Sequence, residues 1–132
     1  MSVAGAVPDV VELQIPAKAE WVAVARLAVA AVANRLDFSM EEIEDVRLAL
    51  AEACTSVIRH SMDSDPIRIH CEATENELAI TVAGGSPGRL QGELRSEDGL
   101  GIVIIRSLMD SVEYRVEQSG VVLQMTKRVE PR

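Results

Sequence analysis

The sequence is poor in aromatic residues and cysteine. Aromatic residues make up only 2 % of its 132 residues, so the interior must be built from Val, Ile, Leu and Ala. The two cysteines, Cys54 and Cys71, have neither the spacing nor the companion ligands of a zinc site. We therefore predict no metal site, and we interpret both as buried apolar residues of a reduced, cytoplasmic protein.

Basic charge and long apolar runs are also scarce. The chain has 13 basic and 21 acidic residues and a formal charge of −8, whereas a protein that binds a phosphate backbone needs a basic surface. The N-terminus lacks the basic region of a secretion signal. The alanine- and valine-rich run at 22–32 contains Arg26 and is too short to span a bilayer. We expect a soluble protein with neither nucleic acid nor a membrane as partner.

The clearest pattern lies between Ser39 and Ser61. Ser39 followed three residues later by Glu42 is a capping box, which predicts the start of a helix. Apolar residues then recur at steps of three and four with no Gly or Pro between them, which predicts that one face packs against a core. This stripe consists of Ile43, Val46, Leu50, Ala53 and Val57.

Polar residues flank that stripe at helical spacing: Asp45, Glu52, Ser56 and Arg59. A carboxylate beside an apolar stripe can serve as a general base, so Glu52 with Ser56 is a candidate site. The alternative is an ordinary solvated helix face with Glu52 near Arg59, and spacing alone favours that alternative.

The remaining periodicity predicts an α/β sandwich, a mostly antiparallel sheet covered on one face by helices. The chain is expected to form one domain over 1–132, with its core at about 10–127. We predict strands at 10–15, 67–72, 77–83, 112–117 and 121–127, helices at 17–36, 39–61 and 102–109, and a loop at 86–98. The 17–36 helix is expected to be amphipathic, with a stripe of Trp21, Val24, Leu27, Ala28 and Ala31.

Gly99 and Gly101 precede the last predicted helix. Glycines at that place let backbone N–H groups approach a phosphate, and the helix dipole favours the anion. A single G-x-G is a weak signal, and a loop end that needs glycine for its backbone freedom explains it equally well. Both interpretations stay open on these residues alone.

The runs EIEDVRLALAEACTSVIRH, ELAITVA, DGLGIVIIRSLMDSV and SGVVLQMTKR together resemble the RsbW and SpoIIAB group of bacterial anti-sigma factors. These are cytosolic serine protein kinases built on the histidine-kinase-like (Bergerat) ATPase fold. The similarity extends from about Val10 to Lys127, and the order of the elements also matches. The resemblance implies ATP and Mg²⁺ as cofactors and Glu52, the glutamate of the family's E-x-x-x-N motif, as the catalytic base.

The resemblance also marks departures in the nucleotide site. Ser56 stands where the family has the asparagine that helps to bind Mg²⁺, and a shorter hydroxyl does not reach the same point. Gly84, Gly85 and Ser86 replace D-x-G, whose aspartate accepts the adenine amino group. Val122 replaces a threonine that supports the adenine site. Only Gly99 and Gly101, on the phosphate side, keep the pattern.

The resemblance implies a homodimeric regulator that binds a sigma factor, with the first helix, including Arg26 and its neighbours, supplying much of the sigma-binding and dimer surface. A STAS-domain anti-anti-sigma factor would antagonise it. With three polar anchors replaced, we expect weak or lost kinase activity. Two alternatives remain. The chain is an active serine/threonine kinase that phosphorylates the anti-anti-sigma factor with ATP and Mg²⁺, or it is a sensor or scaffold unrelated to sigma control.

Overall fold

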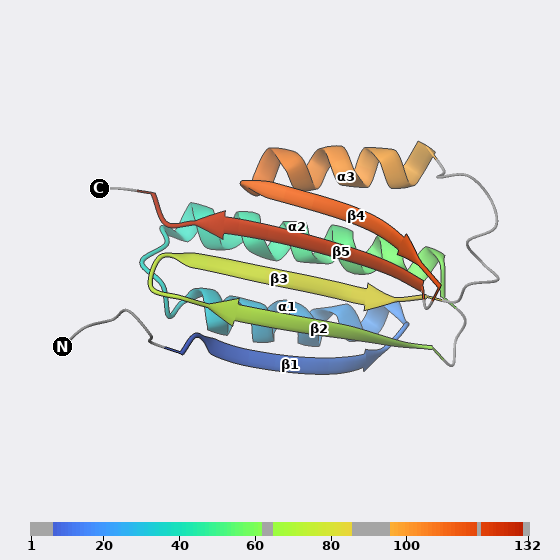
Figure 1. The fold of residues 1–132 in the computed structure, drawn as a ribbon, viewed down its shortest axis with the longest axis horizontal. Helices are drawn as coiled ribbons and strands as arrows, with labels where there is room; N and C mark the ends of the chain where they lie inside the picture. The colour runs from blue at the N-terminus through green and yellow to red at the C-terminus, as the bar shows by residue number, and fades with distance from the viewer. Residues whose placement is uncertain (1–6, 62–64, 86–95, 119, 131–132) are drawn as a thin grey trace.

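The computed structural model describes residues 7–61, 65–85, 96–118 and 120–130. The elements in chain order are β1 (Asp9–Pro16), α1 (Ala19–Ala33), α2 (Met40–Arg59), β2 (Pro66–Ala73), β3 (Glu77–Gly84), α3 (Ser96–Leu108), β4 (Ser111–Glu117) and β5 (Gly120–Arg128). The strands form one five-stranded antiparallel sheet in the order β1-β2-β3-β5-β4. The three helices lie on one face of this sheet, which confirms the predicted α/β sandwich (Figure 1).

The sequence determines the start of α2 as predicted. The Ser39 hydroxyl accepts from the Glu42 amide at 3.1 Å, and the Glu42 carboxylate accepts from the Ser39 amide at 2.7 Å, so the capping box is complete. Val46, Leu50, Ala53 and Val57 are fully buried, and Ile43 packs against them. The predicted stripe is therefore the face of α2 that contacts the sheet.

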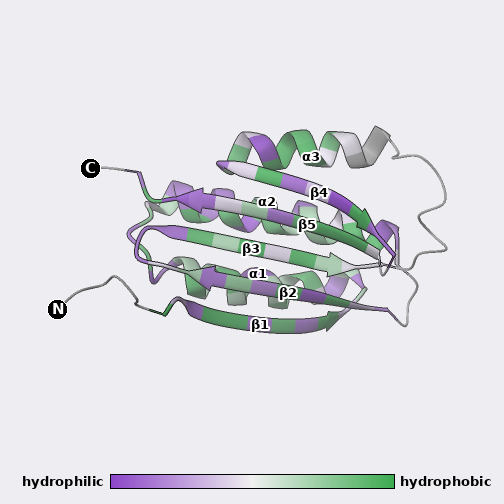
Figure 2. Ribbon diagram, in the orientation of Figure 1, coloured by the Kyte–Doolittle hydropathy of each residue, from purple (hydrophilic) through white to green (hydrophobic). Residues whose placement is uncertain are grey.

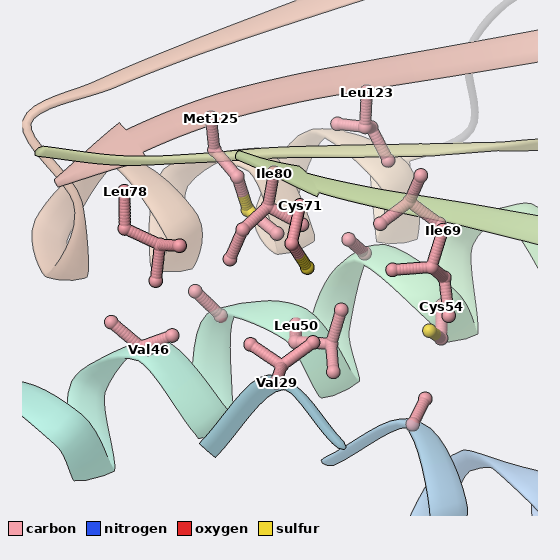
Figure 3. Close-up of a cluster of buried hydrophobic side chains, with 14 of the residues drawn as sticks. Val29, Val46, Leu50, Cys54, Ile69, Cys71, Leu78, Ile80, Leu123 and Met125 are labelled. Atoms are coloured by element: carbon pink, nitrogen blue, oxygen red, sulfur yellow. The ribbon is translucent and has the colours of Figure 1, made fainter. Parts of the chain in front are cut away.

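The core lies between α2 and the sheet. Alternate residues of β2, β3 and β5 face the helices, and Figure 2 shows this alternation of hydrophobic and hydrophilic residues along the strands. Figure 3 shows the inward side chains of the three strands above those of α1 and α2. The labelled members of this core are Val29, Val46, Leu50, Cys54, Ile69, Cys71, Leu78, Ile80, Leu123 and Met125.

The buried face of α1 differs from the predicted one. The residues that α1 buries are Ala25, Val29, Val32 and Ala33. Three members of the predicted stripe are exposed instead, namely Trp21 at 43 %, Val24 at 41 % and Leu27 at 67 %. Since α1 is apolar nearly all round, its periodicity cannot select one face, and contacts with β1, β2 and α2 decide which face is buried. The helix also ends at Ala33 instead of residue 36.

The predicted loop at 86–98 overlaps the start of α3 at its C-terminal end. The helix α3 begins at Ser96 instead of residue 102. Residues 86–95 lie outside the described residues, as does Ser86 of the predicted site. Gly99 and Gly101 are therefore part of α3 and do not precede it.

A histidine joins the edge strand β1 to β2 on the sheet face away from the helices. The two ring nitrogens of His70 lie 3.2 Å from a Glu12 carboxylate oxygen and 3.0 Å from a Glu72 carboxylate oxygen. The hydrogen bonds with Glu72 and Glu12 raise the pKa of His70 above its ordinary value of 6.5. The protonated ring therefore stabilises the fold.

We expect this contact to make stability depend on pH. The pKa of His70 is higher in the folded chain, so its contribution is complete below pH 6.5 and is lost as the pH rises through the raised pKa. The side chain is 37 % exposed, so solvent screens the pair and the contribution stays under about 1 kcal/mol. Urea unfolding of the wild type and of His70→Gln between pH 5.5 and 8.5 measures it. The variant should show a flatter profile, and identical profiles would contradict the assignment.

Candidate active site

The candidate site lies where the C-terminal half of α2 meets α3. Glu52 and Ser56 are one helical turn apart on α2, and Glu52 is half-buried. Gly101 of α3 is buried against this turn, because a Cβ added to it would lie 3.7 Å from Oε1 of Glu52. The structure thus brings Gly101 of α3 next to Glu52 of α2, although the two residues are far apart in the sequence.

Ser56 is buried, with 3 % of its surface exposed, although its sequence position predicted the flank of the stripe. Its Oγ has no hydrogen-bond partner among the described residues. A buried hydroxyl without a partner costs about 1–3 kcal/mol in desolvation. Packing alone therefore does not explain why a polar residue occupies this buried position.

Cys54 lies between these two residues in α2 and is fully buried. Burial raises the pKa of its thiol to about 12 and that of Cys71 to about 11. Since the thiolate is the nucleophile and the metal ligand, neither cysteine supplies these functions at neutral pH. The described residues also contain no group of three or more His, Cys, Asp or Glu side chains able to hold a metal ion.

The glycines predicted to face phosphate occupy different positions in α3. Gly99 lies in its first turn, and a Cβ added there would meet no atom within 4 Å. Gly101 is the sixth residue of α3. Beyond the first four residues each amide of an α-helix donates to the carbonyl four residues earlier, so the Gly101 amide belongs to the helical ladder. What Gly101 provides at the site is room beside Glu52.

The predicted base-side residues do not gather in one place. Gly84 ends β3 and lies against Val57, next to Ser56. Val122 is in register with Ala83 of β3 and Arg115 of β4. Its two neighbours on β5, Val121 and Leu123, are both buried. Val122 therefore lies on the sheet face away from the helices. Val121, and not Val122, is in register with Gly84 and faces the helices. The alternation of inward and outward residues in SGVVLQMTK is the sequence signal that distinguishes these two neighbours.

Arg26, the predicted partner-binding residue, lies on α1 and is half-buried. Its Nε is buried and has no hydrogen-bond partner among the described residues. Arg26 thus lies on α1, whereas Glu52 and Gly101 of the candidate site lie on α2 and α3.

Comparison with known proteins identifies the family to which the chain belongs. The family model of the histidine kinase-like ATPase domain matches residues 15–127. The chain belongs to this family. RsbW serine-protein kinases resemble it along most of its length. The one from Halalkalibacterium halodurans is 39 % identical, with 91 % of this chain and 83 % of the relative aligned, and the one from Bacillus cereus strain AH820 is 36 % identical over 91 % and 85 %.

A solved structure supports the fold alone. The catalytic domain of histidine kinase ThkA matches with a TM-score of 0.56 and 14 % sequence identity, over 92 % of this chain and 99 % of that one. The suspected family and fold are thus confirmed. No helix in the described part of the chain is long and apolar enough to cross a membrane.

The family implies ATP with Mg²⁺, and the residues present fit this cofactor only in part. Glu52 and the room beside it at Gly101 are retained. The base side does not fit, because a Cβ at Gly84 would lie 2.9 Å from the carbonyl oxygen of Pro66. Sequence reasoning missed Pro66, His60 and Gly120 around this point, since no local pattern indicates which backbone atoms contact one another across the fold.

Proposed function

We propose that this chain is a cytoplasmic anti-sigma regulatory factor. It acts as a single histidine-kinase-like domain that binds a sigma factor and is antagonised by a STAS-domain anti-anti-sigma protein, with weak or lost kinase activity. The similarity to RsbW proteins over 91 % of the chain supports the class of partner. Gly84 leaves no room for the side chain that would accept the adenine amino group, which supports a function that depends on binding proteins and not on transferring phosphate.

The observation that carries the proposal is the exposed apolar face of α1. Trp21, Val24 and Leu27 leave 43 %, 41 % and 67 % of their surface exposed on one helix. Exposed apolar residues gathered on one element favour protein binding, whereas singly scattered ones are ordinary. On the neighbouring edge strand β1, Val11 lies on the same sheet face as α1 and is 39 % exposed. We assign this surface, the α1 surface, to protein partners: a sigma factor and the second copy of a homodimer.

Leu27→Glu should weaken both associations by at least about tenfold, because a charge replaces the most exposed apolar side chain of α1. Analytical ultracentrifugation measures the dimer, and co-purification with sigma factors of the source cell measures the complex. Val116→Glu is the matched control, since Val116 is 56 % exposed on β4, at the opposite edge of the sheet from β1. Unchanged association in Leu27→Glu would remove the assignment of the α1 surface.

Two observations support the kinase alternative: the half-buried carboxylate of Glu52 beside Gly101, and the similarity to RsbW proteins named as serine-protein kinases. Incubation with radiolabelled Mg–ATP and the STAS-domain protein separates the two functions. We expect no label on the partner. Label that appears with the wild type and disappears with Glu52→Gln would establish the active kinase in place of the binding-only regulator.

A further inference from the structure

The end of β3 is packed so closely that only glycine fits there. A Cβ built on Gly84 would lie 2.9 Å from the Pro66 carbonyl oxygen, 2.9 Å from Val57 Cγ1 and 3.5 Å from the Ile67 Cα. Two of these three atoms are backbone, and Val57 is a β-branched residue with a stiff side chain in the middle of the core. None of them yields at low cost.

Two further glycines close the same place from other segments. Gly120 has a φ of +137°, and a Cβ there would overlap with the Gly84 carbonyl oxygen and lie 3.0 Å from that of Gly85. Gly85 has a φ of +93°, and its Cβ would lie 3.1 Å from the His60 carbonyl oxygen. Gly84, Gly85 and Gly120 therefore form a junction, here called the glycine junction, which joins the end of β3 to the start of β5 and the end of α2.

We propose that the glycine junction seals the base end of the family's nucleotide site, so that this chain has lost adenine recognition through its packing and not only through one missing side chain. The part that concerns partner binding rests on the proposed function. If the site is sealed, association with the sigma factor is independent of nucleotide.

The surroundings of Gly84 also disfavour a carboxylate on electrostatic grounds. A side chain at this buried position begins next to the Pro66 carbonyl oxygen, which repels a negative charge, and a valine methyl group, which cannot donate to it. A buried charge without a donor is strongly destabilising. An aspartate at position 84 would therefore disrupt the junction instead of restoring an acceptor for adenine.

Three variants test the seal by thermal unfolding and by calorimetric titration with Mg–ATP and Mg–GTP. Gly84→Asp should lower Tm by about 10 °C or more without gaining affinity for either nucleotide. Gly84→Ala, which adds only the Cβ, should lower Tm by a smaller amount and keeps the test informative if the aspartate variant does not fold. Ala83→Asp is the matched control, because Ala83 is half-buried on the opposite sheet face, and it should stay within a few degrees of the wild type.

The wild type should give no saturable heat with either nucleotide at millimolar concentration. A Gly84→Asp variant that gains ATP affinity, a Gly84→Ala variant with unchanged Tm, or a wild type that prefers ATP to GTP would each overturn the seal. Co-purification with sigma factor with and without Mg–ATP separates the two proposals. Association that requires ATP refutes the seal alone, whereas no association in either condition refutes the proposed function and leaves the seal to the titrations.

Discussion

Gly120→Ala is expected to lower the free energy of unfolding by about 3 kcal/mol or more, a large fraction of the about 5–15 kcal/mol that stabilises a typical domain. The added methyl group would overlap with the Gly84 carbonyl oxygen, and both residues belong to the ends of strands that pair in the sheet. Overpacking costs about 1–3 kcal/mol, and a backbone conformation that only glycine adopts easily costs a similar amount. The φ of +137° at Gly120 makes both penalties apply at once.

Urea unfolding followed by circular dichroism measures this loss, with the midpoint and slope analysed separately. Gly99→Ala is the matched control, because Gly99 lies in α3 and an added Cβ would meet nothing within 4 Å. There alanine should be neutral or stabilising by up to about 1 kcal/mol, since it is the better helix former. If the two alanine variants have equal stability, the glycine junction is not close-packed in solution.

The contrast between these glycines shows where sequence reasoning reaches its limit. Gly99 and Gly101 stand out in DGLG, and a local pattern suggested phosphate binding for both. Gly120 lies at a turn and belongs to no recognisable motif, although a Cβ added to it would have the least room among the described glycines. Its constraint comes from Gly84, 36 positions earlier in the chain. A requirement that arises from two distant backbone segments leaves no periodic signal.

Most of the fold was predictable because its determinants are local. The capping box at Ser39 and the uninterrupted stripe after it specify α2, and strict alternation specifies β2, β3 and β5. The face of α1 was not predictable. Its sequence EWVAVARLAVAAVA is apolar nearly all round apart from Glu20 and Arg26, so the choice between burying Val29 and burying Leu27 depends on tertiary contacts. That ambiguity has a functional meaning, because a helix with two apolar faces can pack on the core and also bind a partner.

The candidate site was predictable in part for the same reason. Glu52 and Ser56 share one helix, so helical spacing places them one turn apart. The proximity of Glu52 to Gly101 depends on how α2 packs against α3, which no local pattern specifies. Val122 was assigned by similarity of sequence, and the strand register places it on the opposite face from Val121. A shift of one residue along a strand moves a side chain from one face of the sheet to the other.

Leu50→Ala should lower the free energy of unfolding by about 2–5 kcal/mol, because Leu50 is fully buried in the core that joins α2 to the sheet (Figure 3). The surrounding side chains come from β2, β3 and β5 as well as α1, so a cavity there cannot close by the movement of one element. Leu50 lies two residues before Glu52. The loss should therefore also weaken the position of α2 against α3.

Leu48→Ala is the matched control for this prediction. It makes the same change on the same helix, but Leu48 is 49 % exposed, so the loss should stay below about 1 kcal/mol. Equal losses in the two variants would contradict the assignment of the buried face of α2.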